Sequence, residues 1–219
     1  MASSKPQDTD SWVFINMPYG EKHESMLIAL TVVTIAMKRQ PFPAFLIADR
    51  GSGRISKIVE AIKQCPYSIH DLSIIPEGLP RYNMPFELGI ACAFNQIGYP
   101  QEHPHAFCVY VGSNKDAEKT LTDLKFMDPQ EDSGFLNDGS SRDKQCEAAI
   151  CAIIDELCTD DNNPNAEKVF HVFDHAVDTL RGLKAARHAR TLFKPSIYND
   201  FIDVVFEFCV QEGILVDAK

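Results

Sequence analysis

Two acidic residues, Asp71 and Glu87, have the type and spacing needed for chemistry on a sugar. Asp71 ends an apolar stretch, and Glu87 follows 16 residues later, ahead of the small residues Gly89 and Ala91, which permit close approach. If the two carboxylates share a pocket, one placed about 3 Å from an anomeric carbon can act as a nucleophile or support an oxocarbenium-like transition state. The alternative is that Glu87 only stabilises the first turn of a helix, where the helix dipole favours an acidic residue.

A short glycine-containing segment is a candidate phosphate site. Gly51, Ser52, Gly53 and Arg54 lead into a predicted helix, and Arg81 could reach the same anion. Backbone N–H groups at a helix start, together with an arginine, can bind phosphate. The segment matches neither a P-loop nor a complete dinucleotide-binding fingerprint, so a plain turn and a solvated Arg81 remain the alternatives.

Other candidate substrate contacts lie near the ends of predicted strands and at the start of the helix that carries Glu87. Asn16, Pro18 and Tyr19 follow the first strand, and Asn83 and Phe86 precede Glu87. Ligands of open parallel sheets bind outside the carboxyl ends of the strands, which is where we expect these five residues to lie. Asn83 is also a candidate helix cap. Tyr19 and Phe86 can stack on a base, or they can be simple packing residues.

Histidines and cysteines give weaker signals. His70 directly precedes Asp71, so in a strand the two side chains point to opposite faces, and we expect Asp71 to face the pocket and His70 to be buried in the core or behind the site. His171 and His175 have a metal-binding spacing, but no third ligand is indicated. The seven cysteines contain no CxxC pair and fit a reduced, mainly buried set. We therefore expect no metal and no required cofactor.

The elements that must position these residues alternate between strands and helices. Apolar runs predict strands at 12–16, 44–48, 67–72 and 106–111, and helical spacing predicts helices at 21–39, at 55–64 and onward from 85. The helix at 21–39 is apolar nearly all round, which predicts burial on two sides. This alternation predicts a three-layer α/β domain with a mostly parallel sheet over residues 12–112.

The remaining chain changes character. Residues 113–167 hold 14 acidic against 5 basic residues and form a loop-rich segment with one predicted helix at 144–157. Residues 168–219 predict two amphipathic helices, at 168–190 and 198–210, which we interpret as an appendage that packs on the core or forms a subunit interface. A homo-oligomer formed through these helices is therefore expected.

Composition narrows the function classes. The chain has 219 residues, of which 45% are hydrophobic and 24% charged, values typical of a globular protein. A net charge of -10 argues against direct binding of nucleic acid or an anionic membrane. The longest apolar stretch, at 26–37, is too short to span a bilayer, and the polar N-terminus lacks the apolar region of a secretory signal. A cytoplasmic location is expected.

Three segments resemble a known superfamily. Phe14-Ile15-Asn16, the run from Ile69 to Ser73, and above all the run from Met84 to Ala91 (MPFELGIA) are similar to the nucleoside 2-deoxyribosyltransferase-like superfamily. That superfamily is close in fold to TIR domains, which also carry an essential glutamate early in a helix. The resemblance covers roughly residues 12–112. It implies a flavodoxin-like sheet and cleavage of N-glycosidic bonds of nucleosides, nucleotides or NAD.

The resemblance also implies roles for individual residues. Glu87 corresponds to the catalytic glutamate, and Asp71 to the strand-end aspartate that orients the ribose or protonates the leaving base. The deoxyribosyltransferase pattern has a further aspartate where this chain has Arg81-Tyr82-Asn83, a departure that favours a phosphorylated substrate. The Ser/Cys/Trp-containing stretch that precedes the glutamate in TIR domains is also missing.

The predicted function is therefore an N-glycosidase that acts on a nucleotide or on NAD. The alternative is a nonenzymatic, TIR-like module that senses nucleotides or oligomerises. Either activity is consistent with a role in prokaryotic antiviral defence.

Overall fold

A parallel five-stranded sheet forms the centre of the protein. The computed structural model describes residues 11–47, 53–72, 83–97, 105–112, 130–131, 142–158 and 163–216. The strands are β1 (Trp12–Asn16), β2 (Gln40–Pro43), β3 (Tyr67–Asp71), β4 (Ala106–Gly112) and β5 (Gln130–Glu131), in the order β2-β1-β3-β4-β5. All four pairs are parallel. The chain moves from β1 to one side and then crosses to the other, so the topological switch point lies between β1 and β3.

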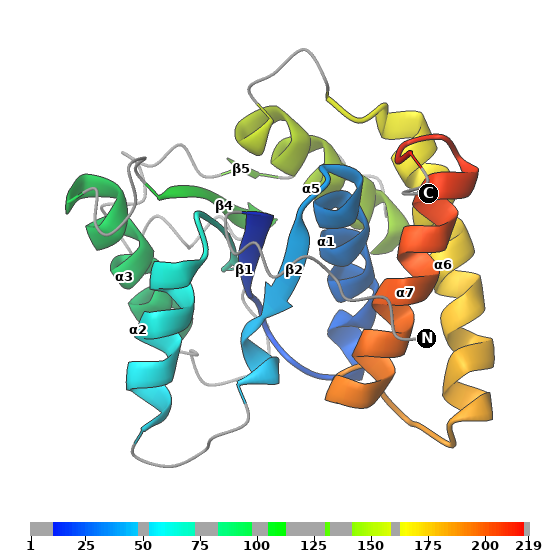
Figure 1. Cartoon of the computed structure of the whole chain (residues 1–219), viewed down its shortest axis with the longest axis horizontal. Coiled ribbons are helices and arrows are strands. Elements are labelled where there is room, and N and C mark those ends of the chain that lie inside the picture. The colour runs from blue at the N-terminus through cyan, green and yellow to red at the C-terminus, as the bar shows by residue number, and fades with distance from the viewer. Residues whose placement is uncertain are drawn as a thin grey trace.

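Helices cover both faces of this sheet (Figure 1). Helices α2 (Arg54–Gln64) and α3 (Asn83–Ile97) lie on one face, and α1 (Glu24–Ala36) and α5 (Arg142–Leu157) lie on the other. The C-terminal helices α6 (Ala166–Ala186) and α7 (Pro195–Gln211) pack on the outer side of α1. The prediction of an α/β fold with a parallel sheet is confirmed, and its strand order is compatible with a flavodoxin-like layered fold.

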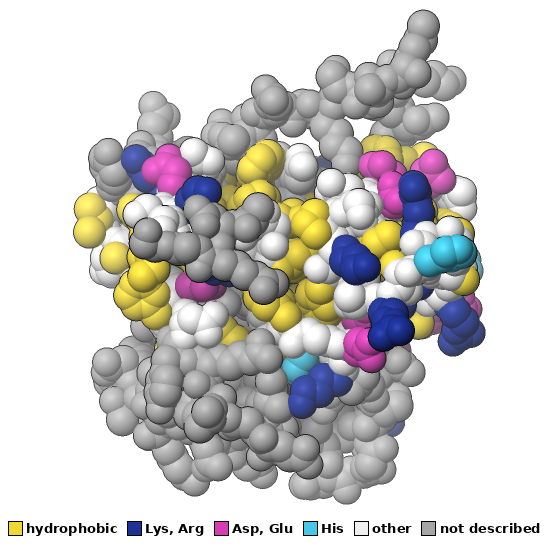
Figure 2. All heavy atoms as spheres, turned by 90° about the horizontal axis from the view of Figure 1, so that it is seen from below, with side chains coloured by type: hydrophobic (Ala, Val, Ile, Leu, Met, Phe, Trp, Pro, Cys, Tyr) yellow, Lys and Arg dark blue, Asp and Glu magenta, His cyan; other side chains and the backbone are white. Residues whose placement is uncertain are grey.

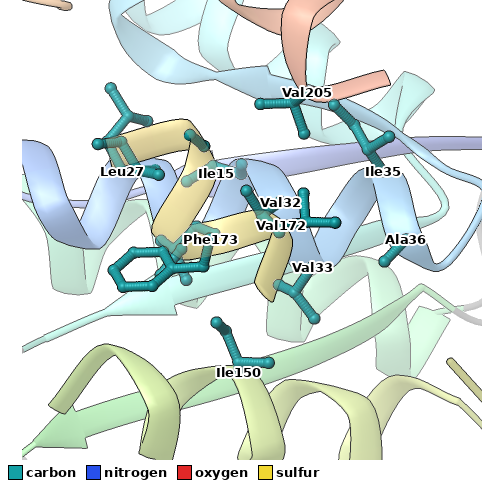
Figure 3. Packing of buried hydrophobic residues seen from close by; sticks show 14 of the residues in the cluster. Ile15, Leu27, Val32, Val33, Ile35, Ala36, Ile150, Val172, Phe173 and Val205 are labelled. Carbon is teal, nitrogen blue, oxygen red and sulfur yellow. The ribbon is translucent and has the colours of Figure 1, made fainter. Parts of the chain in front are cut away.

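Helix α1 is buried on both sides, as its all-round apolar sequence predicts. Ten consecutive residues, Leu27 to Ala36, are buried. Figure 3 shows side chains of α1 between Ile15 of β1, Ile150 of α5, and residues of α6 and α7 such as Phe173 and Val205. The described parts of the three predicted segments therefore share one hydrophobic cluster.

The predicted position of the second strand was wrong. The strand is Gln40–Pro43, and most of the apolar run at 44–48 instead forms a 3-10 helix, Ala44–Leu46. Strand β2 pairs only with β1, so it is an edge strand. Pro41 and Pro43 lack N–H groups, and their alternate positions put both missing donors on the open side of the strand. An edge position thus accommodates two prolines within the strand.

Two features of the later chain were not predicted. The acidic segment contributes β5, a two-residue strand that extends the sheet beside β4. The turn between α6 and α7 is joined to the start of α1 by Glu24, whose carboxylate accepts from Lys184 Nζ at 2.7 Å and from the Leu192 N–H at 2.6 Å. These bonds fix the C-terminal helices to the core at the end where the strands finish.

Candidate functional site

The candidate site lies at the carboxyl ends of the strands, beside the switch point. Asn16 ends β1 and is paired in register with His70 of β3. Asn16 Nδ2 donates to the carbonyl of Met84 at 2.9 Å, which brings the first turn of α3 to this position. Figure 2 views the molecule from this end, where hydrophobic side chains reach the surface near the middle and Lys and Arg side chains gather on the side of α6 and α7.

Glu87 is the central residue of this site. It is the fifth residue of α3 and only 2% exposed. Its Oε2 atom is buried and has no hydrogen-bond partner among the described residues. Burial raises the pKa of this carboxyl from 4.5 to about 7, while the positive charge of Arg54 and a hydrogen bond from the Asn83 side chain act in the opposite direction.

This position corrects the expectation that Glu87 lies in the first turn. No acidic residue is present in the first turn of α3 as described. Glu87 therefore lies beyond the free N–H groups that make an acidic residue favourable at a helix start. Burial of an ionisable oxygen without a partner costs stability, and such perturbed groups concentrate at functional sites.

Arg54 stands at the start of α2, close enough to Glu87 to favour its charged form. Its Nη1 donates to the carbonyl of Ile47 at 2.9 Å and its Nη2 to that of Ala44 at 3.5 Å. The guanidinium thus fixes the chain after β2 while supplying positive charge. Gly53 has an ordinary helical conformation with φ of -84°, and Gly51, Ser52 and Arg81 lie outside the described residues.

Asp71 approaches the site from the other face of the sheet. It ends β3 in register with Tyr110, whose hydroxyl donates to the Gln145 carbonyl of α5. Strand alternation therefore directs Asp71 toward the face covered by α1 and α5, whereas His70 faces α3. Asp71 is buried, with 1% exposure. The two carboxylates reach the carboxyl edge of the sheet from opposite sides.

The other predicted contacts have different surroundings. Tyr19 packs edge-on against Phe45 and Phe193, with ring centroids 5.9 and 5.7 Å away, so it belongs to an aromatic cluster. Pro18 is buried. In contrast, Phe86 is 53% exposed and its ring is available to a ligand.

The small residues near Glu87 also behave differently from one another. Gly89 is exposed, and no described atom would lie within 4 Å of an added Cβ. Gly89 therefore makes no close packing contact in the described structure, and the expectation that it permits a close approach to Glu87 stays a prediction. Ala91 is fully buried in the cluster formed with residues of α2 such as Ile58 and Ile62, so its small size does serve helix packing.

A buried polar strip lies beneath α3 and was not predicted as a unit. It consists of Asn16, Ser68, His70 and His105, all at most 4% exposed. His70 is fully buried, as expected from its alternation with Asp71. The sequence signal for the rest was the alternate placement of Ser68 and His70 in β3, which puts both polar side chains on one face.

Known proteins give no relative for this arrangement. No family model, curated protein or solved structure matches the chain. The site must therefore be interpreted from its own geometry.

Other parts of the described chain carry less chemistry. A cavity of about 250 Å³ between β2 and α2, lined by Trp12, Phe42 and Lys57 among others, includes none of the predicted site residues. The described residues contain no group of three or more His, Cys, Asp or Glu side chains arranged to hold a metal ion. Within those same residues, no helix combines the length and apolar character needed to cross a membrane.

Proposed function

We propose that this protein is an N-glycosidase that cleaves the bond between base and ribose in a nucleotide or in NAD, with Glu87 as the catalytic carboxylate. The observation that carries the proposal is the buried Oε2 of Glu87, which has no partner among the described residues, at the switch point of a parallel sheet. A structural glutamate in a helix is normally exposed or fully paired.

The pKa of about 7 suits this role because a useful fraction of Glu87 is ionised at neutral pH. In the proposed reaction, the carboxylate attacks the anomeric carbon or supports the positive charge that develops there. The N-glycosidic bond breaks and its electron pair leaves with the base. In the covalent route, water then attacks the anomeric carbon, the bond to Glu87 breaks, and the proton of the water passes to solvent.

An anionic substrate is favoured by the charges around the site. Arg54 contributes positive charge next to Glu87, and the first turn of α2 directs backbone N–H groups toward the same end of the sheet. Exposed Phe86 supplies an apolar surface for the base. Asp71, buried at the end of β3, is assigned to the ribose.

The proposal has wider features of different origin. A flavodoxin-like core and a role in antiviral defence follow from the superfamily resemblance. A cytoplasmic location follows from the reduced cysteines, and an assembly of several copies follows from the amphipathic C-terminal helices. None of them is required for the Glu87 chemistry, so each can fail separately.

The decisive experiment follows release of free base by chromatography from NAD and a panel of nucleotides. We expect base release from the wild type and loss of at least about 10³-fold with Glu87→Gln, which removes the charge and keeps the shape. Glu60→Gln, on the exposed surface of α2, is the matched control and is expected to retain full activity.

The assay is run at low and high protein concentration, since an enzyme active only when assembled would otherwise look inert. Base release that survives Glu87→Gln contradicts the assignment. Ligand binding without product at every concentration, unchanged in Glu87→Gln, favours the nonenzymatic sensor instead.

A further inference from the structure

The polar strip beneath α3 is hydrogen-bonded to both ends of that helix. We infer that Asn16, Ser68, His70 and His105 are positioning residues, which hold α3 at both ends and thereby fix where Glu87 lies. The inference rests on the proposed function for its catalytic consequence. Its structural part, the fixing of α3, stands without that function.

The strip is a continuous series of short contacts. Asn16 Nδ2 lies 3.1 Å from His70 Nδ1, and Ser68 Oγ lies 2.8 Å from His70 Nε2. The same Ser68 oxygen lies 2.7 Å from His105 Nε2. His105 in turn hydrogen-bonds the backbone of Cys65. The series thus runs from the carboxyl edge of the sheet to its amino edge.

The direction of every bond in the series is determined by its first member. Met84 O can only accept, so the nitrogen of the Asn16 amide faces it, and that nitrogen also donates to His70 Nδ1. His70 must then carry its proton on Nε2 and donate to Ser68. The Ser68 hydroxyl is left to donate to His105 Nε2, so His105 carries its proton on Nδ1 and donates to the Cys65 backbone.

Both imidazoles are therefore neutral, and they hold opposite tautomers. Burial lowers the pKa of His70 to about 3 and that of His105 to about 4, which agrees with neutral rings at physiological pH. A series in which each donor has one acceptor tolerates no reversal at a single position, because reversal would face two acceptors or two donors toward each other.

The strip touches α3 at both of its ends. Asn16 binds the Met84 carbonyl in the first turn, and Asn95 in the last part of the helix donates to the His105 carbonyl at 2.7 Å. Helix α3 has few apolar anchors, since Met84, Leu88 and Ala91 are its only buried apolar residues in the described structure. Partly buried Ile90 and Phe94 also pack against the α2 cluster, and the hydrogen bonds at both ends add to this limited apolar packing.

The test uses Asn16→Asp, which keeps the size of the side chain and replaces the donor nitrogen by oxygen. Two acceptors then face each other at Met84, and we expect the amides of α3 to exchange with deuterium at least about tenfold faster than in the wild type. For base release we expect kcat to fall about 10- to 100-fold, with KM changed less than about threefold. Tyr198→Phe is the matched control, because it removes a buried 2.9 Å hydrogen bond to Thr31 on the opposite face. It should leave α3 exchange and kcat unchanged.

Nitrogen-15 NMR of the wild-type imidazoles is a second readout that does not depend on activity. We expect protonated Nε2 in His70 and protonated Nδ1 in His105 at pH 7. If both rings held the same tautomer, or if either ring were charged at that pH, the inference would be overturned. Unchanged α3 exchange in a folded Asn16→Asp protein would also overturn it.

A further variant covers the case in which Asn16→Asp does not fold. Asn95→Ala removes only the bond at the far end of α3 and is expected to speed exchange in the last turns of that helix. Exchange there equal to wild type overturns the two-ended attachment. If the wild type releases no base at all, the proposed function fails, while exchange and tautomers still decide whether the strip fixes α3.

Discussion

The two faces of the sheet are stabilised in different ways. On the face covered by α1 and α5, apolar residues of seven elements (β1, α1, β3, β4, α5, α6 and α7) form one large cluster, and some buried hydroxyl groups there are satisfied within their own helix. Thr31 and Thr34, for example, donate to the carbonyls one turn earlier in α1. On the face covered by α2 and α3, the apolar clusters are smaller, a polar strip replaces part of the core, and Glu87 Oε2 is buried without a described partner.

This difference assigns most of the stabilising apolar packing to one face and Glu87 to the other, with Asp71 on the apolar side at the end of β3. The closely packed apolar face contributes most of the free energy of unfolding. This contribution offsets the free-energy cost of burying ionisable groups on the other face. The face with the less favourable interactions is also the one that carries the candidate catalytic carboxylate. The following predictions test this division, beginning with the largest expected effect.

Phe173→Ala should reduce the free energy of unfolding by about 3–5 kcal/mol, because it opens a cavity in the large cluster. Phe173 is 1% exposed and comes from α6. Urea unfolding measures the change, with Phe206→Ala, at a side chain 44% exposed on α7, as the control. Base release per folded molecule should remain close to wild type in both variants. A selective loss of activity in Phe173→Ala would show that the two faces are not separate.

Glu87→Gln should stabilise the protein at high pH by about 3 kcal/mol at most. The folded-state pKa of Glu87 is about 7, above its usual 4.5, so the folded state holds the proton more tightly. The contribution of Glu87 to the free energy of unfolding is therefore fully present below about pH 4.5 and is lost as the pH rises through about 7. The neutral glutamine lacks this decline, and the gap between the two proteins should widen from pH 4.5 to 8. A variant that is less stable than wild type at pH 8 would indicate that Glu87 has a structural ion-pairing role.

The pH dependence of kcat/KM tests which form of Glu87 acts. Because the ionised carboxylate is the reactive form, kcat/KM should rise about tenfold per pH unit at low pH and level off above pH about 7. Steady-state rates of base release across pH 5 to 9 measure this limb. A rate that falls as pH rises through 7 would instead assign Glu87 as a proton donor.

Phe86→Ala should have the smallest effect on folding, less than about 0.5 kcal/mol, because the side chain is already half exposed. We expect KM to rise several-fold if its ring stacks on the base, with kcat little changed. Ile55→Ala, at another exposed apolar side chain, is the comparison on α2. Equal KM values for wild type and Phe86→Ala would remove Phe86 from the site.

Sequence periodicity was sufficient for some elements and insufficient for others. The all-round apolar pattern of α1 identified burial on two sides, and alternation identified the buried His70. The position of β2 was missed because a strand can contain prolines when it lies at the edge of a sheet. Only the strand pairing shows which strand lies at the edge. Similarly, the side of the sheet that Asp71 faces depends on which helices cover it. The polar strip combines residues 16, 68, 70 and 105, which no local spacing connects.

The stacked pair at the sheet edge gives the protein an internal optical reporter. Trp12 is the single tryptophan of the sequence, and its ring stacks on Phe42 of β2 with centroids 5.2 Å apart. It packs with the cluster of α2 and not with that of α1. Intrinsic tryptophan fluorescence therefore reports the state of one face alone. If the two faces unfold at different denaturant concentrations, the emission change and the loss of helical circular dichroism will have different midpoints.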